Sequence, residues 1–142
     1  MAKDIRSLSG RARAVYGIGC LLLGCYPIAL ALGFIPVDDA ELTAPRLVIG
    51  GAGLTFVVAG FMILLADYSR ANNLLAGVLL LLFGIMGMWV AVLSSDDGFS
   101  GGLPFISEEV NILVGRWVFG IGALICFALC VYAFRLAASR PK

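Results

Sequence analysis

The sequence predicts an all-α integral membrane protein, a four-helix bundle whose helices cross the bilayer. The first observation is composition: 61% of the residues are hydrophobic and 13% are charged, whereas soluble domains are about half apolar and about a quarter charged. The second is the presence of four apolar stretches, each long enough for the roughly 20 residues that a transmembrane helix needs. These stretches are 14–35, 45–66, 73–94 and 112–134, with loops at 36–44 and 95–111 in one domain, 1–142.

Each apolar stretch lacks an internal acid and is bounded by charged or turn-forming residues. The first ends shortly before Asp38, and the second begins at Pro45, where a missing N–H costs a helix nothing. The third lies between the turn 67–72 and a second acidic loop. The fourth follows Ser107, a residue typical of helix caps, and Glu108 and Glu109, whose charges suit the positive end of a helix dipole.

The basic residues orient the helices, because short cytoplasmic loops carry an excess of lysine and arginine. Two basic residues, Arg46 and Arg116, fall on the side opposite to the other eight, and most acids fall on the side of these two. The other eight are Lys3, Arg6, Arg11, Arg13, Arg70, Arg135, Arg140 and Lys142. We therefore expect a multi-pass protein with both termini in the cytoplasm and an acidic outer face.

The four stretches group into two helical hairpins that read as a repeat. The second stretch opens Arg46-Leu-Val-Ile-Gly50 and the fourth opens Arg116-Trp-Val-Phe-Gly120, while the first and third share glycines and leucines at corresponding places. Apolar segments rich in Gly, Leu and Val also produce such matches by chance. A true repeat here would be of the parallel kind, related by an axis along the membrane normal.

Small residues recur every seven positions in the apolar stretches, and small residues let helices approach closely in lipid. The series are Gly17, Gly24 and Ala31; Gly53 and Gly60; Gly77, Gly84 and Ala91; and Gly115 and Gly122. The fourth stretch also has Gly122, Cys126 and Cys130 on one helical face. That face either packs inside the bundle or offers a contact surface to another membrane protein.

The four cysteines all lie within apolar stretches. Counting along the helices places Cys20 near the depth of Cys130 and Cys25 near that of Cys126. A thiol or metal cluster would form if the first and fourth helices were neighbours. Buried cysteine ordinarily acts as a small hydrophobic residue, so we expect no catalytic, metal or cofactor-binding residue here.

Arg46 and Arg116 each lie near the outer end of a predicted helix. Their side chains could extend to the headgroups or pair with outer acids such as Glu108 and Glu109. The alternative is an anion or substrate site. The long outer loop adds Phe99 and Phe105, apolar residues in a Gly-rich segment, which favours docking on a partner or on the membrane interface.

Two segments carry a family resemblance, 44–60 and 115–124, which begin Ala44-Pro45-Arg46 and Gly115-Arg116-Trp117. With them the chain resembles a group of small bacterial membrane proteins of four spans and no assigned activity. The resemblance implies a location in the bacterial inner membrane and the same topology. It implies no site residues.

These observations favour a non-enzymatic accessory or scaffold subunit that binds other membrane proteins or itself in the lipid bilayer. With a net charge of +1 and no histidine, the chain offers no basic face for nucleic acid and no imidazole for catalysis. The alternative is a small transporter or channel formed by oligomerisation, with Arg46 and Arg116 at an outer vestibule. A redox or metal-handling role for the cysteines ranks third.

Overall fold

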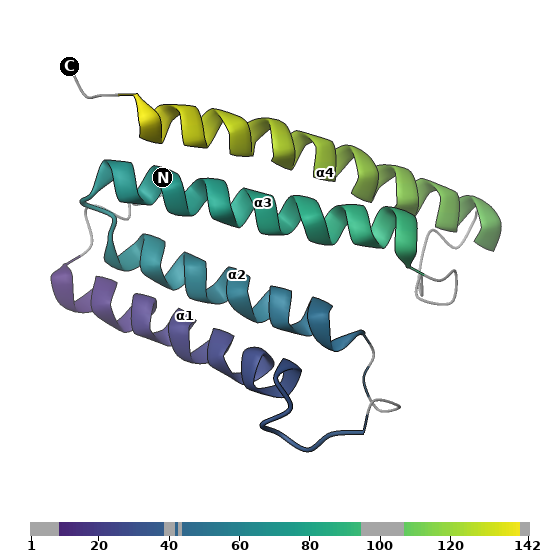
Figure 1. Ribbon diagram of the computed structural model, residues 1–142, viewed down its shortest axis with the longest axis horizontal. Coiled ribbons are helices and arrows are strands. Elements are labelled where there is room, and N and C mark those ends of the chain that lie inside the picture. The colour runs from purple at the N-terminus through teal and green to yellow at the C-terminus, as the bar shows by residue number, and fades with distance from the viewer. Residues whose placement is uncertain (1–8, 39–41, 43, 95–106, 140–142) are drawn as a thin grey trace.

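The computed structural model describes residues 9–38, 42, 44–94 and 107–139, and these form four α-helices (Figure 1). They are α1 (Gly10–Ala31), α2 (Arg46–Leu64), α3 (Ser69–Leu93) and α4 (Glu108–Ala138). The part of the chain described here contains no strand. Each helix is long and apolar enough to cross a membrane. The prediction of an all-α, four-span membrane protein is confirmed.

Helix α1 ends at Ala31 although the apolar run continues to residue 35, and Gly33 is the reason. Its φ of 77° lies in the left-handed region, which glycine adopts without steric cost. In this conformation the N–H of Gly33 donates to the Leu30 carbonyl (3.1 Å) and that of Phe34 to the Ala29 carbonyl (3.0 Å). This pair of bonds is the Schellman motif, which satisfies carbonyls at a helix end.

Helix α4 is 31 residues long, about 46 Å at 1.5 Å per residue, so it exceeds the roughly 30 Å of the hydrocarbon core. Glu108 and Glu109 occupy its first turn, as predicted. Ser107 is the N-cap residue, but its side chain makes no capping hydrogen bond. The predicted capping hydroxyl at Ser107 is therefore wrong, and the acids of the first turn are what favour this helix start.

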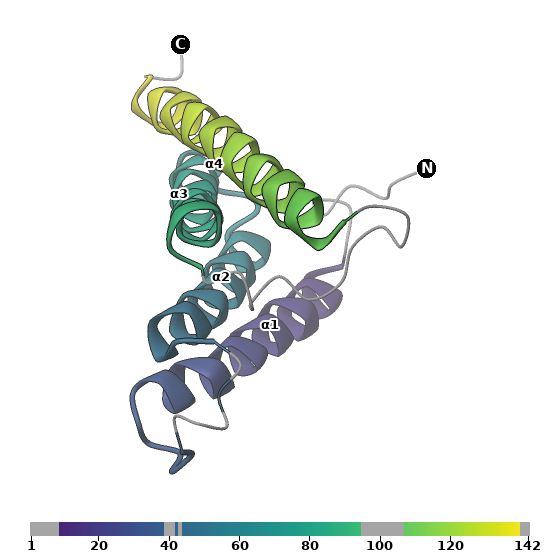
Figure 2. The same ribbon diagram turned by 90° about the vertical axis from the view of Figure 1, so that its right-hand side faces the viewer.

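The helices lie side by side in chain order, so the bundle is an open, curved row (Figures 1 and 2). Extensive contacts join α1 to α2 and α3 to α4, and the two hairpins meet through α2 and α3. The other helix pairs touch only marginally. Helices α1 and α4 are therefore the two edges of the row, each with one main neighbour.

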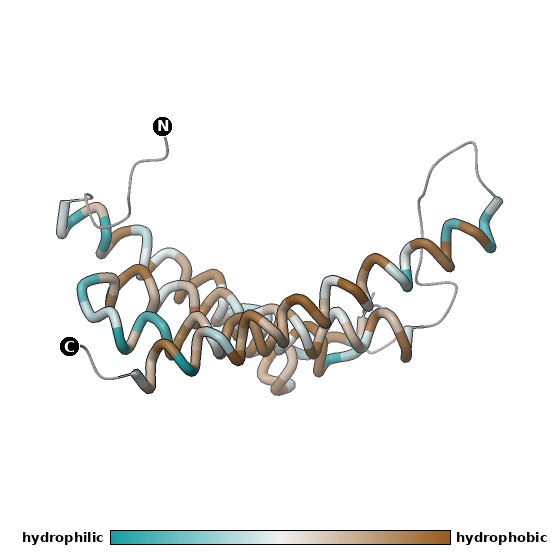
Figure 3. The backbone as a smooth tube through the Cα atoms, turned by 90° about the horizontal axis from the view of Figure 1, so that it is seen from above, coloured by the Kyte–Doolittle hydropathy of each residue, from teal (hydrophilic) through white to brown (hydrophobic). Residues whose placement is uncertain are grey.

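Charged residues gather at the two ends of the helices, and apolar residues fill the middle of the helices (Figure 3). The end that holds the start of α1 and the finish of α4, here the Arg13 end, carries Arg11, Arg13, Asp67, Arg70 and Arg135. The opposite end, here the Arg116 end, carries Asp38, Arg46, Glu108, Glu109 and Arg116. An apolar belt between two polar ends is the distribution that a bilayer requires.

At the Arg13 end an ion pair joins α1 to the turn after α2. The Arg13 side chain is 13% exposed and its guanidinium contacts the carboxylate of Asp67, which is 67% exposed. Exposed ion pairs contribute about 0–1 kcal/mol. We expect Asp67→Asn to lower the unfolding free energy by less than about 1 kcal/mol, measured by denaturant titration in detergent. A loss well above that would contradict this assignment.

Candidate functional site

The first hairpin is joined by glycines from both helices. A Cβ added at Gly24 would lie 2.5 Å from the carbonyl oxygen of Gly53, and one at Gly53 would lie 2.7 Å from that of Gly24. The same reciprocity holds between Gly17 and Gly60, at 3.2 and 2.8 Å from the facing carbonyl oxygen. Real Cβ atoms essentially never lie under 3.0 Å from a backbone oxygen, so Gly24, Gly53 and Gly60 can be replaced only if the helices move apart. The predicted roles of these four glycines in packing are confirmed.

The second hairpin pairs glycines with phenylalanine rings. A Cβ at Gly77 would lie 2.6 Å from the ring of Phe134, and one at Gly84 would lie 2.7 Å from that of Phe127. Each ring of α4 therefore lies in the space that a glycine leaves on α3. The contact is dispersion between packed atoms, which is the main attraction between helices in lipid.

The two hairpins use corresponding positions for these contacts. Adding 60 to a residue number in α1 gives its counterpart in α3, and adding 70 to one in α2 gives its counterpart in α4. Three pairs in the first hairpin then map onto three in the second: Gly17–Leu64 onto Gly77–Phe134, Gly24–Val57 onto Gly84–Phe127, and Ala31–Gly50 onto Ala91–Gly120. The two hairpins therefore agree in their contacts as well as in their residue types, which supports the internal repeat.

Helix α4 does not use the predicted Gly122 for this packing. A Cβ at Gly122 would meet nothing within 4 Å, whereas Ala123, Cys130 and Ala137 are buried, at 2%, 5% and 2% exposed. These three also recur by sevens, and the first two are the repeat counterparts of Gly53 and Gly60. The prediction of Gly122 as an internal packing residue is wrong, because α4 presents the next residue to α3.

The face of Gly122, Cys126 and Cys130 is accordingly divided. Cys130 is buried in the seam with α3, in the position that Gly60 has in the first hairpin. Gly122 and Cys126 instead line an apolar groove of about 290 Å³ along α3 and α4. The other residues around it include Phe83, Met86, Val118 and Phe119. This groove, here the Gly122 groove, is open to the surroundings of the protein.

Arg46 and Arg116 bind the ends of the helices that precede them. The guanidinium of Arg46 donates to the carbonyls of Leu30 (3.2 Å) and Val37 (2.9 Å). That of Arg116 donates to Ala91 (3.1 Å) and Ser94 (2.8 Å). Helix ends leave carbonyls without intrahelical partners and carry partial negative charge. Each arginine therefore stabilises the end of the first helix in its own hairpin.

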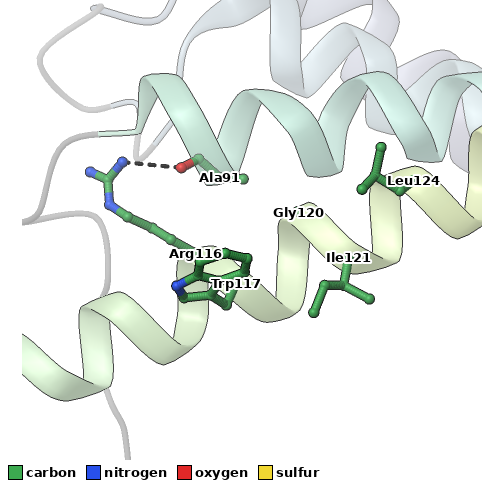
Figure 4. Close-up of a pocket in the computed structure, with 6 residues that line it drawn as sticks. All are labelled: Ala91, Arg116, Trp117, Gly120, Ile121 and Leu124. Carbon is green, nitrogen blue, oxygen red and sulfur yellow. Dashed lines mark hydrogen bonds between the residues drawn. The ribbon is translucent and has the colours of Figure 1, made fainter.

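Figure 4 shows Arg116 reaching from α4 to Ala91 at the end of α3, while Ile121 projects from the side of α4 away from α3. Together with Trp117, Gly120 and Leu124 these residues line a second apolar groove of about 270 Å³. Among the described residues that line this groove, Arg116 is the only charged one, and it is engaged with backbone carbonyls. The sequence did not indicate this capping role, and the shared position of the two arginines was the available signal.

The cysteines are not brought together within one chain. Because α1 and α4 touch only marginally, Cys20 and Cys25 do not meet Cys126 and Cys130 as a cluster would require. Among the described residues no group of three His, Cys, Asp or Glu side chains could hold a metal ion. Cys25 is exposed, and Cys20 and Cys126 are half-buried.

Two further candidates, Glu108 and Glu109, lie at the Arg116 end. Glu108 and Glu109 are exposed in the first turn of α4, where their carboxylates can meet a partner or the headgroup region. Phe99 and Phe105 lie outside the described residues. The acidic part of the predicted interaction surface is therefore accessible.

Comparisons with protein-family models, curated proteins and solved structures find no match to this chain. The described residues form four helices that are long and apolar enough to cross a membrane, as in a multi-pass membrane protein.

Proposed function

We propose that this chain is a non-enzymatic accessory or scaffold subunit of the bacterial inner membrane that binds other membrane proteins. The distribution of lysine and arginine supports an orientation with both termini, and hence the Arg13 end, in the cytoplasm. The resemblance to small bacterial four-span proteins supports the location. The Arg116 end, with its exposed Glu108 and Glu109, then faces outward.

The Gly122 groove is the observation that carries this proposal. Lipid tails are as apolar as leucine, so helices associate in a bilayer where small residues permit closer contact than lipid gives. In the first hairpin Gly17, Gly24, Gly53 and Gly60 contact the facing helix of the same chain, whereas Gly122 has open space where a Cβ would be. An apolar groove floored by a glycine is a surface on which a partner's transmembrane helix gains contacts that flexible lipid tails make less well.

The exposed acids support the same function at the membrane surface. Glu108 and Glu109 begin α4 at the Arg116 end, and Phe99 and Phe105 precede them in the sequence. Carboxylates and aromatic residues in one segment of the sequence suit a partner surface with basic and apolar groups, because charged groups set orientation and aromatic groups contribute contact area. We propose that the helix groove gives affinity and that the acidic end fixes the register of the partner.

Purification from native membranes in mild detergent, followed by native mass spectrometry, tests this function. We expect the wild-type chain to retain a second protein at fixed stoichiometry. Gly122→Leu should fill the groove and reduce its recovery by about tenfold, which corresponds to about 1.4 kcal/mol. Val131→Leu is the matched control, because Val131 is an exposed residue of α4 outside the groove. If Gly122→Leu recovers as much of the second protein as the wild type does, the Gly122 groove is not the binding site.

Recovery of the chain with no protein other than itself would contradict the accessory role altogether. The alternative hypothesis, a small oligomeric transporter or channel, would then be the better supported one. Flux measurements in proteoliposomes would follow, with Arg116→Ala as the variant expected to abolish transport.

A further inference from the structure

The internal repeat relates the two edge helices, α1 and α4, to the two inner helices, α3 and α2, through which the hairpins pack against each other. Helix α4 is the counterpart of α2, and α1 is the counterpart of α3. Inside the chain, α2 and α3 pack against one another, whereas α4 and α1 lie at opposite edges of the row (Figure 2). We propose that α4 of one copy packs against α1 of a second copy, as α2 packs against α3.

The flank of α2 that meets α3 has a well-defined set of residues. Gly51 contacts Met86 of α3, since a Cβ at Gly51 would lie 3.6 Å from the Met86 sulfur. Thr55 and Val58 share this face by their spacing, and they are 9% and 6% exposed. This face is opposite to the one that carries Gly53 and Gly60 toward α1. Helix α2 therefore has a covered flank on each side.

The counterpart flank of α4 is uncovered. Adding 70 to Gly51, Thr55 and Val58 gives Ile121, Ile125 and Ala128. Ile121 is 51% exposed and Ile125 is 55% exposed, and Ala128 is also exposed. Figure 4 shows Ile121 on the side of α4 that faces away from α3. In the described part of the chain, this apolar flank therefore stands about half exposed, while its counterpart on α2 is covered.

Helix α1 presents the complementary flank. Subtracting 60 from Met86, and from Leu82 and Leu79 on the same face of α3, gives Tyr26, Leu22 and Gly19. Tyr26 is 63% exposed, Leu22 is 67% exposed, and a Cβ at Gly19 would meet nothing within 4 Å.

The antiparallel register of Gly51 with Met86 fixes how the two edges would meet. It places Ile121 opposite Tyr26 of the second copy, Ile125 opposite Leu22, and Ala128 opposite Gly19. The last pair is small on both helices, which is the arrangement that lets backbones approach in lipid. Flexible lipid tails, the other occupant of these flanks, do not pack as closely on such a site. The observations therefore favour a second copy, and the contact is heterologous, so copies add until a ring closes.

Disulfide cross-linking between differently tagged copies tests this contact. All four native cysteines are first replaced with alanine. A chain with Tyr26→Cys is then co-expressed with a chain with Ile121→Cys, and native membranes are oxidised with copper phenanthroline. We expect a cross-linked species that carries both tags, severalfold more abundant than in the control. The control pair is Ile18→Cys with Leu129→Cys, which lies at the same depth in the proposed register and is similarly exposed, but whose two residues fall on opposite sides of the proposed contact.

A second measurement shows that the cysteine-free chain is folded. Gly51→Cys with Met86→Cys in one chain should form an intramolecular disulfide, because these residues are in contact. With that bond formed, a yield from the Tyr26 and Ile121 pair no greater than from the control pair would overturn the proposal. So would a monomeric disulfide when Tyr26→Cys and Ile121→Cys are placed in one chain, because the bundle would then close on itself. Neither result depends on the Gly122 groove, so this inference and the accessory role fail separately.

Discussion

Replacing Gly24 with leucine should separate α1 from α2 and give the largest loss of stability of any single change in the first hairpin. A Cβ at this position would lie 2.5 Å from the Gly53 carbonyl oxygen and 3.0 Å from the Val57 backbone nitrogen. These atoms are backbone, so no rotamer change relieves the clash and the helices must move apart. Overpacking costs about 1–3 kcal/mol where a core can adjust, and we expect the upper end or more.

The measurement is the midpoint of thermal unfolding in detergent, followed by the fraction of chain that stays monodisperse. Gly19→Leu is the matched control, because it makes the same change on the same helix at a position with nothing within 4 Å. We expect Gly19→Leu to leave the midpoint of the detergent-solubilised monomer nearly unchanged. Equal midpoints for the two variants would show that the close approach of Gly24 to Gly53 does not hold the hairpin together.

Replacing Arg116 with alanine should have the second-largest effect, in the other hairpin. The change removes two hydrogen bonds, to the carbonyls of Ala91 and Ser94. Neutral hydrogen bonds between transmembrane helices average only about 0.6 kcal/mol, but bonds from a charged group contribute about 1.5–3 kcal/mol each. The positive guanidinium is also attracted by the partial negative charge at the end of α3. We therefore expect a loss of several kcal/mol in a denaturant titration monitored by tryptophan fluorescence.

Arg116→Lys separates this capping role from the roles that need charge alone. An ammonium group keeps the charge but lacks the planar fork that donates to two carbonyls at once. The lysine variant should therefore have a stability between those of the wild type and Arg116→Ala. Full recovery by lysine would instead indicate that Arg116 acts as a headgroup anchor or a simple counter-charge.

The helices were predictable because a bilayer imposes length and hydrophobicity on any segment that crosses it. The residues at which the helices end were less predictable. The apolar run of α1 contains no polar residue that marks Ala31 as its end, and the left-handed turn at Gly33 decides it. Arg46 and Arg116 donate to carbonyls at the ends of α1 and α3, so their capping roles depend on where those two helices end. Such pairing becomes visible only once both helices are placed.

The packing register of α4 shows a different limit. Counting glycines predicted Gly122, whereas the structure buries Ala123 and Cys130. In lipid the requirement is for a small side chain, which alanine and cysteine also meet. Applying the offset of 70 between α2 and α4 to Gly53 and Gly60 would have predicted both buried positions. The repeat was thus a better guide to the seam than the identity of one residue type.

The order of contacts along the row also governs how the chain can assemble during synthesis. Helices α1 and α2 pack mainly on each other, as do α3 and α4, so the glycine contacts between α1 and α2 can form before the second hairpin has left the ribosome. Short loops between partners keep the entropy of bringing them together small. Because the first and last helices touch only marginally, the mature arrangement needs no rearrangement when the final helix enters the membrane. Assembly can proceed in the direction of translation, because the helix synthesised last always lies at an edge of the row.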